Sequence, residues 1–164
     1  MLTVVPDSGE SVTHRRAREL QRSLEEAVDC VDHLLRVLHN ERDALSAGNV
    51  EQLDYCGQQK ADCVVQLETV DSRRAQQCRE LGIRNDDIDE FLAAHKCSDG
   101  TSWQHFTTRL ASCRDANSLN NALVRIRRGH IEKALGILRG ASGDTPLYGP
   151  DGLDTPSGSP LGRA

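Results

Sequence analysis

The feature that most constrains this chain is the absence of proline between Pro6 and Pro146. Within this span, apolar residues recur at intervals of three, four and seven, which is the spacing of one face of an α-helix. Proline breaks helices, so its absence leaves long helices uninterrupted. A long helix that is apolar along one side must place that side against other helices. The sequence therefore predicts packed helices, with no β-sheet between His14 and Arg139.

Two long helices joined by a short turn are predicted for the N-terminal half, at about residues 14–46 and 50–81. Gly48 suits a left-handed helix end, and Asn49 with Gln52 three positions later suits a capping box. Because the turn is short, the helices are expected to form an antiparallel hairpin. The apolar side of the first helix alternates threes and fours, as in a coiled coil: Ala17, Leu20, Leu24, Ala27, Val31, Leu34, Leu38 and Leu45.

Charged residues interrupt the apolar sides of both helices. Glu41 interrupts the first, and Lys60 and Arg74 interrupt the second. The two basic side chains are expected to lay their aliphatic stems along the hairpin and to keep their charges in water. An acceptor on the facing helix is the alternative.

A short helix at about residues 86–95 is expected to fold over one end of the hairpin. Ser102 is a candidate cap for a third long helix, residues 102–139. Asn117 and Asn120 interrupt its apolar side, and buried amides that fix helix register are the favoured interpretation, with a polar notch in a binding groove as the alternative. The remaining residues of this side are expected to pack against the other helices: Trp103, Phe106, Leu110, Cys113, Val124, Ile131, Ala134 and Leu138.

These patterns predict an all-α protein, an elongated antiparallel three-helix bundle or coiled coil with a short extra helix, over residues 14–140. Residues 1–13 are predicted to be a flexible arm, and residues 141–164, which hold four of the five prolines, a disordered tail. The tail contains one motif that combines bulky residues with a turn signal: Leu147, Tyr148, Gly149, Pro150, Asp151 and Gly152. We interpret it as a short binding motif on a flexible linker, or alternatively as a loop that folds back on the bundle.

Composition and missing motifs argue against several classes of function. The net charge of −5 disfavours nucleic acid. No apolar stretch approaches the ~20 residues of a membrane span and no signal peptide is recognisable, so a cytoplasmic protein without membrane insertion is expected. The six cysteines are then reduced and behave as small apolar residues. No phosphate loop, zinc pattern or nucleophile motif occurs, so we expect no enzyme, no metal and no cofactor.

A basic run follows in the third helix, formed by Arg125, Arg127, Arg128, His130 and Lys133. A solvated helix face is the favoured interpretation, and a surface for an acidic partner is the alternative.

Several features together resemble the FlgN family of flagellar type III export chaperones. The first helix carries Leu34, Leu35, Leu38, Glu41, Ala44, Leu45 and Gly48; the second carries Leu53, Lys60 and Leu67; the third carries Trp103, Leu110, Asn117, Asn120 and Leu123; and the tail carries Leu147 to Gly152. The number of cysteines and the segment of residues 82–102 depart from this resemblance.

The resemblance implies a chaperone that binds the C-terminal segments of the hook-associated proteins FlgK and FlgL in the cytoplasm, prevents their premature assembly, and brings them to the export apparatus. It also implies that Tyr148 and its motif dock on the export gate protein FlhA. An apolar groove between helices suits amphipathic client segments, and the candidates to line it are Leu123, Val124, Ile131, Leu135 and Leu138, each of which is alternatively core. A chaperone for another secreted subunit and a structural coiled-coil adaptor, with weak self-association, remain the rival functions.

Overall fold

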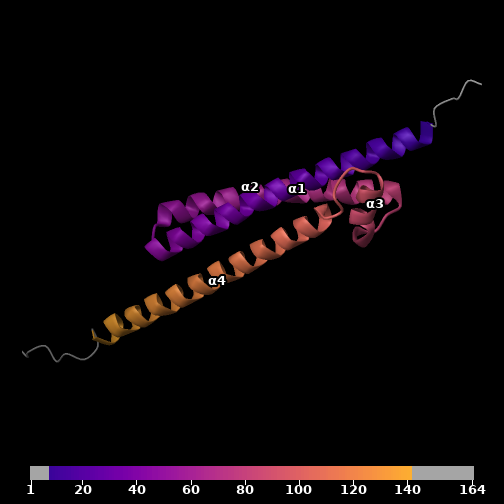
Figure 1. Ribbon diagram of the computed structural model, residues 1–164. Helices are drawn as coiled ribbons and strands as arrows, with labels where there is room; N and C mark the ends of the chain where they lie inside the picture. Colours follow the sequence, from indigo (N-terminus) through magenta and orange to yellow (C-terminus); the bar gives the residue numbers. More distant parts are fainter. Residues whose placement is uncertain (1–7, 142–164) are drawn as a thin grey trace, which may run out of the picture. The chain divides into compact units, whose positions relative to one another are not determined.

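The computed structural model describes residues 8–141, which are helical apart from short connections (Figure 1). The elements are α1 (Ser8–Ala47), α2 (Val50–Leu81), the 3-10 helix η1 (Asn85–Asp87), α3 (Ile88–Ala94) and α4 (Ser102–Ala141). No β-strand occurs within residues 8–141, so the predicted all-α class is confirmed. The chain divides into two compact bodies, one that ends at Arg125 and one that begins at Ile126.

The turn between α1 and α2 has most of the predicted cap chemistry. Gly48 adopts a φ of 71°, the left-handed conformation that glycine tolerates best. The Asn49 side-chain oxygen accepts a hydrogen bond of 3.0 Å from the N–H of Gln52. The N–H of Asn49 donates to the Ala44 carbonyl at 3.0 Å, so the reciprocal half of the predicted capping box is not formed.

α1 and α2 pack antiparallel. Lys60 Nζ lies 2.6 Å from Glu41 Oε1, and Arg73 Nη1 lies 2.6 Å from Glu26 Oε2, so residue numbers rise along one helix as they fall along the other. Lys60 therefore has an acceptor on the facing helix, which was the alternative interpretation of its position. The apolar residues buried between the two helices include Ala27, Val31, Leu34, Leu38, Cys56, Cys63 and Val70.

Residues 102–125 of α4 lie against α1 and run parallel to it. Cys113 Sγ donates to the Val31 carbonyl at 3.4 Å, and Asn120 Nδ2 donates to the Leu38 carbonyl at 2.8 Å. Both pairs are separated by 82 residues in sequence, so residue numbers rise in the same direction along the two helices. Since α2 is antiparallel to α1, these residues of α4 are antiparallel to α2, as the three-helix prediction requires. Phe106, Cys113 and Ala116 join the core of the hairpin.

α3 covers one end of the hairpin, as its position in the sequence predicted. Ile88 and Leu92 are fully buried there. They pack in a second apolar cluster with Ala17, Leu20 and Leu24 of α1 and Cys78 of α2. This cluster fixes α3 to the end of the bundle at which α4 begins.

The start of α4 is capped by a residue of α3. Asp89 accepts hydrogen bonds from the N–H groups of Trp103 and Gln104, at 2.8 and 3.1 Å. A carboxylate satisfies the unpaired N–H groups of a helix N-terminus and is favoured there by the helix dipole. Ser102, the predicted cap, instead donates its hydroxyl to Gln21 Oε1 at 2.9 Å. The prediction for Ser102 was wrong because the cap comes from another element.

Arg74 does not keep its charge in water, contrary to the favoured prediction. The residue is 4% exposed, and its guanidinium lies 4.6 Å from the centroid of the Trp103 ring. Arg74 Nε donates to Asp71 Oδ1 at 2.8 Å, and Nη1 donates to Asn85 Oδ1 at 2.7 Å. A buried cation is tolerated because a carboxylate, an amide and an aromatic face surround it.

The boundaries of the outer helices differ from those predicted. α1 begins at Ser8, ahead of His14, and thus includes part of the predicted flexible arm. The sequence allows this early start, because no proline lies between Ser8 and His14 to interrupt the helix. α4 continues to Ala141. The predicted tail after that residue, with its motif at residues 147–152, lies outside the described residues.

The second body is the end of α4, residues 126–141. Its apolar residues were expected to be buried, but Ile131 and Leu138 are 60% and 64% exposed, so that prediction was wrong. The spacing shows which residues share a side of the helix, but it does not show whether another helix covers that side. Gly129, Gly136 and Gly140 lie on the opposite side of the helix from the apolar residues, at about 100° per residue. Apart from the adjoining residues and the nearby backbone of the same helix, no atom lies within 4 Å of the position a Cβ would take at any of them.

Replacement of Asp89 by alanine tests the cap of α4. We expect Asp89→Ala to lower the free energy of unfolding by about 1–2 kcal/mol, because two N–H groups lose their acceptor. Urea unfolding followed by circular dichroism measures this change. Asp86→Ala, at an exposed aspartate of η1, is the matched control and should change the free energy by less than about 0.5 kcal/mol. Equal effects of the two variants would contradict the capping role.

Candidate binding surfaces

The second body presents an apolar surface along one side of α4. Ile131, Leu135 and Leu138 are spaced by four and three and are 60%, 44% and 64% exposed. We call Ile131, Leu135 and Leu138 the exposed face of α4. An exposed apolar surface of this kind is typical of an interaction site.

The five predicted client-binding residues are divided between the two bodies. Ile131, Leu135 and Leu138 belong to the exposed face, whereas Leu123 and Val124 belong to the first body. Leu123 is half-buried and Val124 is exposed. The alternative that these residues are core therefore does not hold for the four exposed ones.

Sequence reasoning did not single out Ile126 and Ile137, which are also exposed. At about 100° per residue they lie roughly 120–140° around the helix from Ile131, off the stripe of threes and fours. The spacing of that stripe therefore does not identify them.

Basic residues border the exposed face. At about 100° per residue, Arg128 and Arg139 fall beside Leu135, and Arg127 falls on the opposite border beside Leu138. Glu132 is the one acidic residue between positions 126 and 140, and its Oε1 lies 2.9 Å from Arg128 Nε. This segment is therefore basic in a chain of net charge −5. The basic run predicted from the sequence is solvated, and it also borders an apolar surface.

The first body contains a groove between its three long helices, with a volume of about 490 Å³. Apolar residues of all three helices line it, namely Leu34, Leu38, Val64, Leu67, Leu110 and Cys113, together with Lys60, Arg114, Asn117 and Asn121. Val64 and Leu110 were not singled out as site residues from the sequence. The spacing of apolar residues along a helix does not show which of them line a groove between helices.

The two asparagines on the apolar side of α4 have different environments. Asn120 is 1% exposed; its Nδ2 donates to the Leu38 carbonyl and to Glu41 Oε2, each at 2.8 Å, and its Oδ1 accepts from Arg42 Nε at 3.3 Å. It is the buried amide of the favoured interpretation. Asn117 is half-buried and lines the groove, as in the alternative interpretation.

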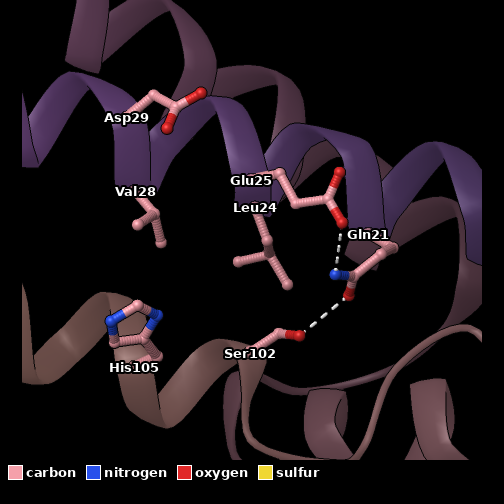
Figure 2. A pocket seen from close by; sticks show the side chains of 7 residues that line it. All are labelled: Gln21, Leu24, Glu25, Val28, Asp29, Ser102 and His105. Atoms are coloured by element: carbon pink, nitrogen blue, oxygen red, sulfur yellow. Dashed lines mark hydrogen bonds between the residues drawn. The ribbon is translucent and has the colours of Figure 1, made fainter.

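A smaller cavity, of about 180 Å³, lies between α1 and the start of α4. Figure 2 shows Gln21 bridging two of its neighbours: Gln21 Nε2 donates to Glu25 Oε1, and Gln21 Oε1 accepts from the Ser102 hydroxyl, each at 2.9 Å. Leu24 and Val28 contribute an apolar wall. The nitrogen and the oxygen of the Gln21 amide thus both form hydrogen bonds. This arrangement joins α4 to α1 and activates no nucleophile.

The cysteines behave as the sequence analysis predicted, as apolar core residues. All six are free thiols, and four of them are buried: Cys56, Cys63, Cys78 and Cys113. Burial raises the pKa of the Cys63, Cys78 and Cys113 thiols, although nearby Arg74 partly opposes this rise at Cys78. A raised pKa keeps the thiol protonated, which lowers its nucleophilicity and its capacity to bind metal.

The described part of the chain contains neither a candidate metal site nor a candidate membrane-spanning helix. Within residues 8–141, no three His, Cys, Asp or Glu side chains are grouped so that they could hold a metal ion. None of the helices described is long and apolar enough to cross a membrane.

An all-α chain with an exposed apolar helix face is typical of proteins that bind other proteins. The chain belongs to the FlgN family, because the family model described as FlgN protein matches residues 16–156. It is thus a flagellar export chaperone by family, and the predicted resemblance is confirmed. No curated protein and no solved structure matches the chain. The matched range includes the motif from Leu147 to Gly152, which lies outside the described residues.

The raised thiol pKa values predict how stability depends on pH. Unfolding returns each thiol to its ordinary pKa of 9.0, so above this pH the unfolded state releases protons that the folded state retains. The stability contributed by Cys63 and Cys113 is fully present below pH 9.0 and is lost as pH rises through the folded-state pKa values. Urea unfolding between about pH 7 and pH 10 measures the slope.

A double variant provides the control for this pH dependence. Cys63→Ala with Cys113→Ala should flatten the alkaline loss of stability, whereas Ser118→Ala, at an exposed side chain without a titratable group, should leave the slope as it is in the unmodified chain. An unchanged slope in the double variant would show that other groups cause the alkaline loss.

Proposed function

We propose that this chain binds the C-terminal segments of hook-associated proteins of the FlgK and FlgL type and delivers them to the export gate protein FlhA. The observation that carries the proposal is the exposed face of α4, in a chain of the FlgN family. An amphipathic client helix places its apolar side on such a face. Client segments held in this way are prevented from associating with one another before export.

In this proposal, Ile131, Leu135 and Leu138 contact the client directly, and Leu123 and Val124 extend the contact toward the start of α4. Complete burial of an aliphatic side chain contributes at most about 1.5–3 kcal/mol, and these side chains are already partly covered. Association and ordering of the client oppose this gain. The resulting affinity is moderate, which suits a chaperone that must release its client.

Docking on the gate is assigned to the motif Leu147, Tyr148, Gly149, Pro150, Asp151 and Gly152. An aromatic ring with a hydroxyl group provides a large contact with few rotatable bonds, which is typical of an interface anchor. Client binding and gate docking are thereby placed on different parts of the chain. No cofactor and no catalysis enter this function.

A single substitution tests the client-binding surface. We expect Ile131→Asp to weaken binding of a C-terminal FlgK or FlgL segment by at least about 10-fold, because it places a charge in the apolar contact. Its melting temperature should stay within about 2 °C of the unmodified chain, since an exposed position is replaced. Calorimetric titration and thermal unfolding of the same sample give both values.

Val65→Asp is the matched control, because Val65 is a similarly exposed aliphatic residue, 62% exposed, on α2. It should leave client affinity unchanged. Loss of stability in Ile131→Asp as large as its loss of binding would instead assign Ile131 to the core. Failure of the unmodified chain to bind either segment would favour a chaperone for another secreted subunit or a coiled-coil adaptor.

A second substitution tests gate docking. Tyr148→Ala should reduce binding of the client-loaded chain to the cytoplasmic domain of FlhA by at least about 10-fold and leave client affinity unchanged. Tyr55→Ala is the matched control, since Tyr55 is the other tyrosine and is 53% exposed on α2. Biolayer interferometry with immobilised FlhA domain measures both variants. Equal binding of the two variants to FlhA would remove the basis for the docking role.

A further inference from the structure

We propose that the helix recognised by the exposed face of α4 is acidic, with Asp or Glu residues bordering its apolar side. This inference rests on the proposed function, because it gives the chemistry of the client at the same surface. It is based on the distribution of charge around Ile131, Leu135 and Leu138.

The borders of the exposed face carry positive charge on both sides. Arg128 and Arg139 lie along one border, and Arg127 lies along the other, beside Leu138. Arg139 forms no ion pair within the described residues, whereas Arg128 is paired with Glu132 at 2.9 Å. In paired helices, the residues beside the apolar contact form the ion pairs that select the partner. A partner with carboxylates at these positions is therefore favoured over a basic or a neutral one.

The same charges disfavour a second copy of this chain as the occupant. Two copies that met through this face would bring basic borders together, and Glu132 is the one acidic residue of the segment. Like charges placed opposite one another across a helix interface are destabilising. The charge pattern therefore selects against self-association and for a different, acidic helix.

A lipid surface fits the face less well than an acidic helix does. Arg127 falls at the border of the face, beside Leu138, and Arg128 falls at the other border. The apolar stripe between them is narrow, and binding of an interfacial helix to lipid scales with the apolar area that it buries. A peptide helix can instead place a carboxylate opposite Arg127.

Two synthetic helical peptides with identical apolar residues test this inference, one with Glu and one with Lys at the bordering positions. Fluorescence anisotropy with the full chain measures both affinities at 50 and 300 mM NaCl. We expect the Glu peptide to bind at least about 10-fold more tightly at the lower salt concentration, because several exposed ion pairs each contribute a few tenths of a kcal/mol or more. This advantage should shrink to about 3-fold or less at the higher salt concentration, since salt screens exposed charges.

A charge reversal in the chain provides the complementary test. Arg128→Glu with Arg139→Glu should weaken binding of the Glu peptide and strengthen binding of the Lys peptide, which reverses the preference. Arg16→Glu with Arg79→Glu, at exposed basic residues of α1 and α2, is the matched control for total charge and should preserve the preference. Equal affinity of the unmodified chain for both peptides, or the same effect of both double variants, would overturn the inference.

Ile131→Asp separates failure of the inference from failure of the proposed site. If this variant abolishes binding of two peptides that bind the unmodified chain equally, the site is correct and the charge preference is wrong. If it leaves the binding of both peptides intact, the exposed face is not the binding surface. Tighter binding to phosphatidylglycerol vesicles, to a peptide of residues 142–164, or to a second copy in sedimentation equilibrium would assign a different occupant and overturn the inference.

Discussion

The packing of the three long helices depends on one buried amide. Asn120 of α4 donates to the Leu38 carbonyl and to Glu41 of α1, and Glu41 also accepts from Lys60 of α2 at 2.6 Å. Side chains from all three helices are thus joined in one hydrogen-bond network. A buried polar group without partners costs a large amount of free energy, so sliding any of the helices by a turn would be strongly unfavourable. Apolar contacts alone tolerate several registers, and the Asn120 network selects one.

The features predicted correctly from sequence depend on residues close to one another in the chain. The helices follow from apolar spacing, and the turn follows from Gly48 and Asn49. The features predicted wrongly depend on distant residues. Asp89 caps α4 from a different helix, and Arg74 is enclosed by Trp103 and Asn85, which come from two other elements. No local pattern shows that a loop will bring such groups together.

The candidate site shows a second limit of sequence patterns. Ile131 and Leu138 continue the same spacing as Phe106 and Cys113, so one pattern describes both a buried and an exposed side of α4. The spacing does not show where along α4 the neighbouring helices stop covering this side. The apolar residues of the surface were therefore predictable from the sequence, whereas their exposure was not. The motif around Tyr148 remains a prediction from the sequence.

The three glycines of the second body bear on how a client leaves. A glycine inside a helix costs about 1 kcal/mol relative to alanine, so Gly129, Gly136 and Gly140 make this helix intrinsically weak. The space around them would admit a methyl group, so packing does not impose glycine at these positions. On the proposal that this face binds a client, local loss of helix order at the glycines would separate the apolar contacts and shorten the lifetime of the complex. Release would then depend on the backbone opposite the contact and not on the side chains that touch the client.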